Sequence, residues 1–345
     1  MNDSSRYQEA RQHLNLSNIA CDVVEYDKVE FLEKQSDRQI LNHIFTMYCD
    51  YAEANISNAC DAYQEKMEEQ LKEFPAGEAK DKMIALLRDA HRKELILTVN
   101  SYPFEHTFKF QLTQENYEYI SSWKDSEEAY DSIPGRFIKA VIEEYARKTY
   151  VEREKIVFRK LIEQVETCIS TKRALIITSK DRKRYEVRPY GVCTDKGYNY
   201  NYLVGLSKEV NSKEDERIAT FRISNISSYK SSSRSGRLTE AQKKEIVEKI
   251  LAVGVQFLVN NPETIAVRLT DKGKKMYERQ AHLRPAYQKR FDNHDGTWTY
   301  EFDCTARQVR YFFFKYGADA EVLYPAYLRE SFRKQYEDAL AIYSK

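Results

Sequence analysis

The segment from Arg184 to Ile226 constrains the fold more than any other part of the chain. It contains three runs typical of β-strands, at residues 184–192, 198–206 and 218–226. Turn signals separate them: Asp195-Lys196-Gly197 after the first run and a charged loop from Ser212 to Glu216 after the second. Short strands separated by turns of this kind predict a compact antiparallel sheet, here a small β-barrel spanning roughly 171–230.

Basic and aromatic side chains are interleaved on these strands. Tyr198, Tyr200 and Tyr202 alternate along one strand, so they share one face, where one or two should enter the core and the rest can stack on a base. Basic residues crowd residues 172–188 against only Asp181 and Glu186. On a chain with a net charge of only +1, such a cluster makes a local field that can attract phosphates.

We therefore predict a nucleic-acid-binding surface on the barrel. The alternative is a solvated basic loop without a ligand. The expected binding residues are Arg173, Lys183, Arg184, Arg188, Tyr200, Tyr202, Arg217 and Arg222.

The same strands carry the pattern of a known domain. The chain has Pro189 in one strand, Asn201-Tyr202-Leu203 in the next, and Phe221-Arg222 followed by Ile226 in the last. This arrangement resembles the WYL domain, a Sm-like (SH3-like) small β-barrel common in bacterial regulators. The chain has Asn201 where the family has Trp, and Ala219 and Asn225 where it often has Arg.

A second pattern lies at residues 104–146. Phe108, Phe110 and Leu112 alternate with polar residues, which predicts a strand with one buried face. Residues 114–123 have helical spacing, and Ser132 and Pro134 mark the start of another helix. One face of that helix is apolar: Phe137, Ile138, Val141, Ile142 and Tyr145.

This order of strand, helix and helix resembles the ribbon-helix-helix family of DNA-binding proteins. The resemblance implies that the polar face of the strand, formed by Thr107, Lys109 and Gln111, would lie in a DNA major groove.

The N-terminal region offers a second copy of this unit. Leu14 and Leu16 alternate with polar residues, and Ile40, Leu41, Ile44, Phe45 and Tyr48 match the apolar helix face at a constant offset. Two such units in one chain could pair their strands and form a pseudo-dimer. The alternative is a simple pair of amphipathic helices. Residues 22–73 are expected to be helical, with Ser36 capping the second helix, and another helix should follow Pro75-Ala76-Gly77.

Two segments flank the predicted barrel. A charged helix over 146–168 should connect to it, and the Ser-rich basic segment 227–237 has the composition of a flexible linker. After a helix near 239–259, the order strand, helix, strand, strand, helix, strand is ferredoxin-like. Val309, Phe312, Phe313 and Phe314 exceed what one helix face can bury, so we expect part of this run to meet a partner in a homodimer.

No catalytic or cofactor motif stands out. The segment Lys272-Gly273-Lys274-Lys275 lacks the first glycine of a phosphate-binding loop, and the six histidines lack metal spacing, so no cofactor, metal or enzymatic activity is expected. Six scattered cysteines without a CxxC pair suit a reducing cytoplasm. No apolar run suggests a signal peptide or a membrane span.

These features predict a multidomain α+β protein. The expected segments are a helical region at 1–100, a ribbon-helix-helix unit at 101–152, a connector helix at 153–170, the WYL domain at 171–237 and a dimerisation domain at 238–345. The combination resembles the WYL accessory proteins of type VI-D CRISPR systems. That resemblance implies a homodimer that binds single-stranded RNA and stimulates an RNA-guided RNase. The alternative is a ligand-sensing transcriptional regulator that binds duplex DNA.

Overall fold

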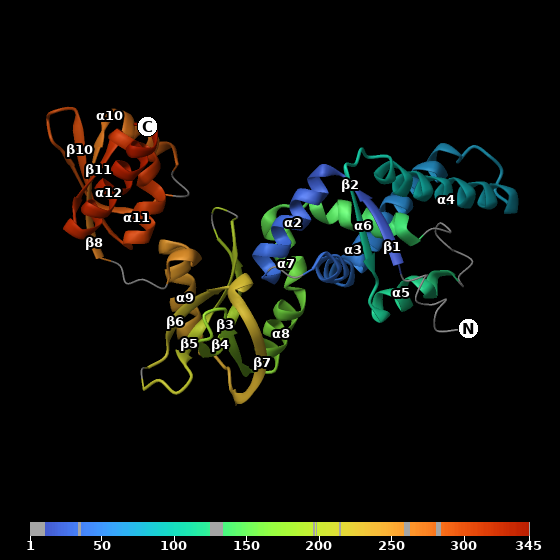
Figure 1. Ribbon diagram of the computed structural model, residues 1–345, viewed down its shortest axis with the longest axis horizontal. Coiled ribbons are helices and arrows are strands. Elements are labelled where there is room, and N and C mark those ends of the chain that lie inside the picture. The colour runs from blue at the N-terminus through green and yellow to red at the C-terminus, as the bar shows by residue number, and fades with distance from the viewer. Residues whose placement is uncertain are drawn as a thin grey trace. The chain divides into compact units, whose positions relative to one another are not determined.

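The chain divides into two compact units, Met1–Arg159 and Lys160–Lys345, in a computed structural model (Figure 1). The structure describes residues 11–33, 36–124, 134–195, 197, 199–213, 215–258, 263–280 and 284–344. Helices and several separate antiparallel sheets alternate along the chain, as expected for an α+β protein. The boundary between the units falls inside the predicted connector at 153–170.

A two-stranded ribbon organises the first unit. Strand β1 (Arg11–Leu16) pairs antiparallel with β2 (His106–Gln111), although about ninety residues separate them in sequence. Leu14, Leu16 and Phe110 turn into the core, and Leu112, just after β2, is buried as well. The two predicted strands therefore do pair within one chain.

Each strand of the ribbon is followed by two helices. After β1 come α2 (Asn18–Leu32) and α3 (Asp37–Gln70); after β2 come α5 (Gln114–Lys124) and α6 (Pro134–Ala146). The two matched apolar faces, on α3 and on α6, are buried in one common core. Two strand-helix-helix segments of one chain therefore share a ribbon and a core. Ser36 caps α3 in a capping box with Gln39, whereas the proposed cap Ser132 lies outside the described residues.

Buried polar groups fix the ends of these helices. The Ser17 backbone amide and hydroxyl both donate hydrogen bonds to the Glu143 carboxylate, at 2.6 and 2.7 Å. Asp27, which is fully buried, accepts from the Tyr145 hydroxyl at 2.6 Å and from Arg153 Nε at 2.7 Å. A buried carboxylate is tolerated only with such partners, so these contacts define one packing of the helices.

Two additions extend the first unit. Helix α4 (Glu78–Asn100) packs against α3 and has no counterpart after α6. The predicted continuous helix over 146–168 is wrong: the chain forms α7 (Tyr150–Val157) and α8 (Arg159–Ser170). Thr149 and Glu152 make a capping box that starts α7, and Phe158 interrupts the helical backbone before α8. The pattern of charged residues alone did not predict the start of α7 or its end at Phe158.

The second unit begins with a five-stranded antiparallel sheet. Its strands are β3 (Arg173–Ser179), β4 (Arg184–Thr194), β5 (Asn201–Glu209), β6 (Arg217–Arg222) and β7 (Ile226–Ser235), in the order β6-β5-β4-β3-β7. The sheet curls strongly, but among the described residues no strand pairing joins β6 to β7. The predicted small barrel is therefore not closed by hydrogen bonds.

The predicted flexible linker at 227–237 is wrong. Most of this segment is β7, which pairs with β3 through Tyr229 opposite Ile177 and Lys230 opposite Ile176. An edge strand needs backbone hydrogen bonds more than apolar side chains, so a Ser-rich segment can serve. Helix α9 (Glu240–Val253) follows, and its Ile246 joins the core cluster that contains Tyr202, Val204 and Leu206 of β5.

The C-terminal domain has the predicted ferredoxin-like order of elements. Its strands are β8 (Glu263–Thr270), β9 (Tyr287–Asp292), β10 (Thr297–Cys304) and β11 (Ala320–Tyr324), in the sheet order β11-β8-β10-β9. Helix α10 (Asp271–Arg279) follows β8, α11 (Ala306–Phe313) follows β10, and α12 (Ala326–Tyr343) closes the chain.

The apolar run of α11 is satisfied inside this domain. Val309, Phe312 and Phe313 are fully buried in its core, and Phe314 stacks on Tyr336 with ring centroids 4.7 Å apart. The expectation that this run meets a partner is therefore wrong. The sheet and α12 pack against α11 within the same domain and cover its apolar side chains.

Candidate nucleic-acid interface

The five-stranded sheet holds a cavity of about 420 Å³ at the end where β6 turns into β7. Its lining comes from the end of β3, the start of β4, the end of β6 and the 3₁₀ turn Ile223–Asn225. The lining residues are Ser179, Lys180, Asp181, Tyr185, Thr220, Phe221, Arg222, Asn225 and Ile226.

Two aromatic rings meet in this cavity. The rings of Tyr185 and Phe221 have centroids 4.9 Å apart and are tilted by 50°. Tyr185 lies on β4 and Phe221 on β6, with β5 between them in hydrogen-bonding order, so the contact requires a strongly curled sheet. Curling turns what would be one face of a flat sheet into a cavity with an aromatic wall. Burial raises the pKa of the Tyr185 hydroxyl, so it stays a neutral hydrogen-bond donor at physiological pH.

The turn from β3 to β4 shapes the rim of the cavity. The Lys180 backbone amide donates to the Asn225 carbonyl at 2.9 Å, which ties this turn to the 3₁₀ turn after β6. Arg182 adopts a left-handed backbone (φ 66°) that closes the turn. Asp181 accepts from the Ser179 hydroxyl, which lowers the pKa of its carboxyl group. The turn thereby presents its basic side chains to solvent around the cavity.

Four of the eight predicted binding residues lie at or beside this cavity: Arg222 in its lining, and Lys183, Arg184 and Arg217 at the adjoining strand ends. Lys183 and Arg184 are exposed at the start of β4, and Arg217 is exposed at the start of β6. Both Lys183 and Arg217 act electrostatically on the Tyr185 hydroxyl and lower its pKa in opposition to burial. Cations from the start of β4 and from the start of β6 therefore lie near the Tyr185 hydroxyl.

Arg222 also contacts two further predicted residues, Tyr200 and Tyr202. Arg222 is paired with Tyr202 across β5 and β6, and its guanidinium carbon lies 3.7 Å from the centroid of the Tyr200 ring. Tyr202 is 6% exposed, and burial raises the pKa of its hydroxyl to about 12. Tyr200 is only half-buried. Of the two described tyrosines of the alternating set, Tyr202 is thus the core member, whereas Tyr198 lies outside the described residues.

The remaining two predicted residues lie elsewhere. Arg188 is held by Glu216 at 2.9 Å, by the Arg237 carbonyl and by Gln242 at 3.1 Å, and its side chain is 19% exposed. These contacts link β4 to the start of α9. Arg173 lies at the opposite end of β3 from the cavity, beside Ser235. The structure therefore distributes the eight residues over several places, and only part of the set surrounds the cavity.

The ribbon of the first unit has a polar outer face. Thr107, Lys109 and Gln111 project there and pair in register with residues of β1: Asn15, His13 and Arg11. The Thr107 hydroxyl donates to the Asn15 side chain at 2.8 Å. The strand predicted to read DNA is thus exposed, as the alternation of its residues requires.

Sequence reasoning did not select Tyr185, Phe221, Lys180 or Asn225 as binding residues. The alternation along β4 and β6 placed Tyr185 and Phe221 opposite their basic neighbours Arg184 and Arg222 and could have indicated an aromatic face. Their meeting in one cavity depends on sheet curvature, for which the sequence gives no signal.

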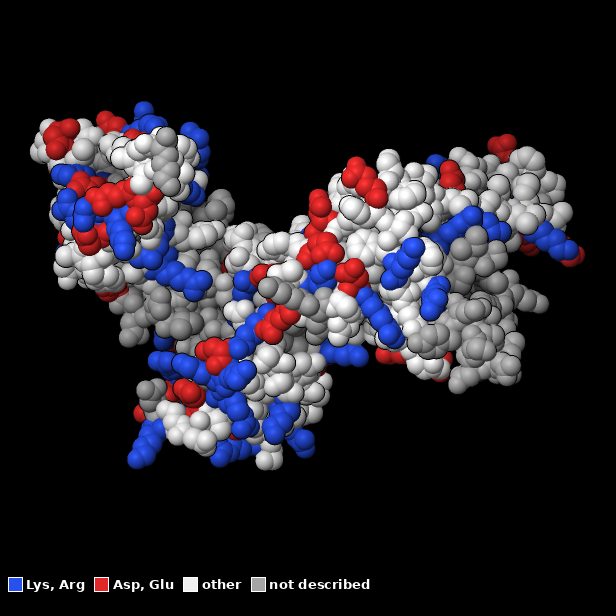
Figure 2. All heavy atoms as spheres, in the orientation of Figure 1, with Lys and Arg blue, Asp and Glu red and all other residues white. Residues whose placement is uncertain are grey.

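Charge is concentrated around this sheet. Figure 2 shows Lys and Arg side chains gathered over the region that Figure 1 labels β4, β5 and β6. In the described part of the chain, no group of three or more His, Cys, Asp and Glu residues is arranged to hold a metal ion. No described helix is long and apolar enough to cross a bilayer.

Comparison with known proteins gives a likeness of fold. No family model and no curated protein matches the chain. A solved structure described as the crystal structure of a CRISPR Cas-related protein matches with a TM-score of 0.74 and 23% identity, over 97% of this chain and 94% of that chain. The proteasome accessory factor B/C (PafBC) of Arthrobacter aurescens gives a TM-score of only 0.30 at 14% identity, over 81% of this chain and 46% of that chain. The first likeness shows a shared fold across almost the whole length.

Proposed function

We propose that this protein binds single-stranded RNA at the cavity of its five-stranded sheet and is a non-enzymatic accessory of an RNA-guided CRISPR RNase. The observation that carries the proposal is the contact of Tyr185 with Phe221 inside a cavity whose lining includes Lys180 and Arg222. Lys183 and Arg217 lie close enough to lower the pKa of the Tyr185 hydroxyl. Bases of an unpaired strand can stack on aromatic rings, and the cations neutralise its phosphates.

The size and shape of the cavity support a single strand rather than a duplex. About 420 Å³ accommodates one or two bases but not a double helix. In duplex RNA the bases are stacked on one another, so they cannot stack on the aromatic rings of the cavity. The CRISPR context is supported by the description of the structural neighbour and by the resemblance of the domain order to WYL accessory proteins. In this proposal the protein is cytoplasmic, uses no cofactor and forms a homodimer.

RNA binding is tested by fluorescence anisotropy with an unstructured oligouridylate of about 20 nucleotides. The variant Lys183→Ala/Arg184→Ala should weaken affinity about tenfold and reduce the slope of log K against log salt by about 1.4, or 0.7 for each lost phosphate contact. The matched control is Lys244→Ala/Lys249→Ala, which removes two exposed cations of α9 that pair within their own helix. Equal losses in both variants would show that the RNA has no preference for the cavity.

The aromatic wall is tested by Phe221→Leu, which keeps an apolar side chain of similar volume. Loss of base stacking is expected to cost about 1–3 kcal/mol of binding. Stimulation is tested by adding the protein to a type VI-D RNase with its guide and target and measuring the rate of RNA cleavage. A rate that is unchanged at saturating protein would refute the accessory role and leave RNA binding in place.

The polar outer face of the ribbon supports a second candidate function. In this alternative the protein is a transcriptional regulator whose β1–β2 ribbon lies in a DNA major groove, with the sheet cavity sensing a nucleic-acid fragment or small effector. Gel-shift competition between unstructured RNA and duplex DNA distinguishes the two functions. Specific binding to duplex DNA that RNA does not displace would favour the regulator.

A further inference from the structure

The C-terminal domain carries a second basic segment that the cavity does not use. Between Asp271 and Asp292 the chain has seven basic residues and three acidic ones, against a net charge of +1 for the whole protein. The basic residues lie on α10 and β9 and in the stretch between them: Lys272, Lys274, Lys275, Arg279, Arg284, Lys289 and Arg290.

Trp298 of β10 brings two of these cations together. The Lys274 ammonium lies 3.5 Å from the centroid of the Trp298 ring, and the Arg290 guanidinium carbon lies 5.3 Å from it. The indole N–H donates to the Asp271 carboxylate at 3.1 Å, which fixes the ring. Helix α10 and strand β9 therefore meet at this half-buried tryptophan, with a cation from each.

Aromatic side chains continue along the same side of the sheet. Tyr287, which is 41% exposed, packs edge-on against Tyr300 with ring centroids 5.4 Å apart. Arg290 pairs in register with Tyr300, so Tyr287, Arg290 and Trp298 follow one another on the helix-bearing side. Aromatic side chains interspersed with cations are an arrangement that single-stranded nucleic-acid tracks use.

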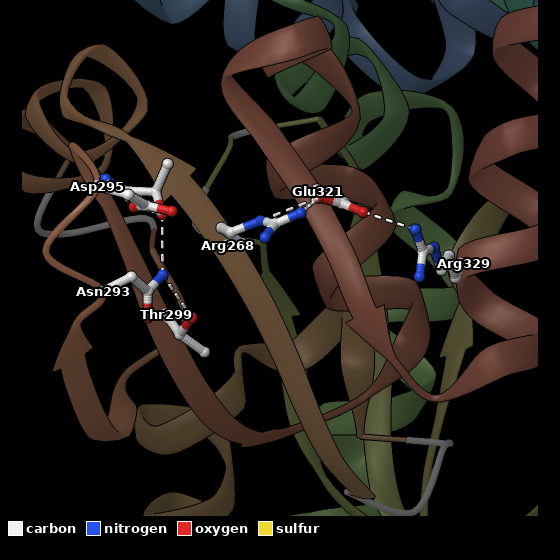
Figure 3. A network of polar contacts seen from close by, with 7 residues as sticks. Arg268, Asn293, Asp295, Thr299, Glu321 and Arg329 are labelled. Carbon is white, nitrogen blue, oxygen red and sulfur yellow. Dashed lines mark hydrogen bonds and ion pairs between the residues drawn. The ribbon is translucent and has the colours of Figure 1, made fainter.

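The two sides of this sheet differ in how their charges are neutralised. Away from α10, Arg268 of β8 and Arg329 of α12 both bind Glu321 (Figure 3), and Lys289 pairs with Glu301 at 3.5 Å. On the helix-bearing side Lys272 pairs with Asp319. For Lys274, Lys275 and Arg279, however, no carboxylate partner is found among the described residues. Unneutralised cations beside exposed aromatic rings favour an anionic ligand.

We propose that the face formed by α10, β9 and Trp298 is a second contact surface for single-stranded RNA, separate from the sheet cavity. The identity of the ligand rests on the proposed RNA-binding function, whereas the surface itself rests on its own residues. Phosphates would lie against Lys275, Arg279 and Arg290, and a base would contact Tyr287 or Trp298. One RNA strand would then make two sets of contacts with the protein, or two strands would bind independently.

The charge test uses the full chain and the same labelled oligouridylate. Lys275→Ala/Arg279→Ala/Arg290→Ala should weaken binding about tenfold and reduce the salt slope by about 2, or 0.7 for each phosphate contact. The matched control, Lys244→Ala/Lys249→Ala/Lys334→Ala, removes three exposed cations from α9 and α12 and should change affinity less than twofold. Circular dichroism melting of both variants establishes that the fold is intact.

Tryptophan emission gives an independent test. Saturating oligouridylate should quench the emission of the unlabelled wild-type protein, and Trp298→Phe should abolish most of this quenching because the indole lies at the contact. Quenching that persists in Trp298→Phe, together with affinity within twofold of wild type in the triple variant, would overturn the proposed surface.

The outcomes separate this surface from the cavity. If Lys183→Ala/Arg184→Ala weakens binding but the C-terminal variants do not, only the second surface is refuted. If Trp298 quenching survives in Lys183→Ala/Arg184→Ala with unchanged affinity, the cavity is refuted and the C-terminal surface remains. Absence of any RNA binding would overturn both.

Discussion

Tyr202 and Tyr200 are two positions apart on the same side of the chain, yet they have different roles. Tyr202 is packed with Val204, Ile246 and Val255 in the core between the sheet and α9. Tyr200 lies at the border of that core and supports the Arg222 guanidinium. If Tyr202 turned outward to bind a ligand, the contacts that hold α9 against the sheet would be lost.

We expect Tyr202→Ala to lower the free energy of unfolding by about 3 kcal/mol, because it removes a buried ring and leaves a cavity. Tyr200→Ala should lower it by about 1 kcal/mol, from the lost cation–π contact and partial burial. Urea unfolding followed by circular dichroism measures both. Equal stability losses in the two variants would show that the ring of Tyr202 is not the one that anchors α9.

The cysteines also differ by position. Burial raises the pKa of the Cys49 thiol to about 11 and that of Cys304 to about 12, so both thiols stay protonated at neutral pH. Cys193 is half-exposed, whereas Cys21, Cys60 and Cys168 are buried.

Ellman's reagent at pH 8 should therefore modify Cys193 first in the folded protein, and all six thiols only after denaturation. Cys193→Ser should remove the fast phase. Because the folded-state pKa of Cys304 lies above its unfolded value, its contribution to stability is present below about pH 9 and is lost as pH rises toward 12. A fast phase that survives in Cys193→Ser would contradict this order of exposure.

At the scale of elements, the β1–β2 ribbon has an exposed polar surface and is held in place from its other side. Asn42 is a buried residue of α3. Its side chain accepts a hydrogen bond from the Thr113 backbone amide at 2.8 Å and donates one to the Gln111 carbonyl at 3.0 Å. These bonds hold β2 in place independently of the side chains on its outer face. Lys109 and Gln111 are consequently open to substitution without loss of the fold.

If the RNA-accessory function is right, Lys109→Ala/Gln111→Ala should leave affinity for single-stranded RNA within about threefold, under 1 kcal/mol. The physical reason is that the aromatic and basic residues proposed to bind RNA lie in the second unit. Anisotropy titration of the double variant measures this. A much larger loss would place the RNA on the ribbon, and a selective loss of duplex DNA binding would favour the regulator.

At the scale of the whole molecule, the expected homodimer needs a different surface from the one first predicted. The apolar run of α11 is buried within its own domain, but other apolar side chains are exposed on the surface of the C-terminal domain. They form two separate groups at opposite ends of α12: Tyr324 and Tyr327 where the edge strand β11 leads into it, and Leu340, Ile342 and Tyr343 where it ends. Large exposed apolar side chains that lie close together are typical of an interface.

We expect light scattering to give the mass of a dimer at micromolar concentration, and Leu340→Glu/Ile342→Glu to shift it toward the monomer. The charged pair should do so because burying two carboxylates at an interface is costly. The control is Lys244→Ala/Lys249→Ala, which leaves α12 unchanged. A wild-type protein of monomer mass would contradict the dimer, and a dimer that resists the double variant would place the interface elsewhere.

Much of the architecture follows from the sequence because periodicity is local. The alternation at Phe108, Phe110 and Leu112 and the repeated apolar face at Ile40–Tyr48 and Phe137–Tyr145 located strands and helices of both strand-helix-helix segments. The order of strands and helices after residue 262 likewise gave the ferredoxin-like domain. Exposure of Lys183, Arg184 and Arg217 was also predictable, since charged side chains on an antiparallel sheet face solvent.

Only the tertiary structure decided which of these residues come together. Curling of the sheet brings Tyr185 to Phe221, and pairing with β3 makes a strand of a Ser-rich segment. Packing of α12 and the sheet around α11 buries an apolar run that the sequence alone marked as exposed. Each of these results depends on contacts between residues far apart in the chain. Composition and periodicity report only on near neighbours, so the sequence specified the elements and their solvent-facing charges, whereas long-range packing created the site.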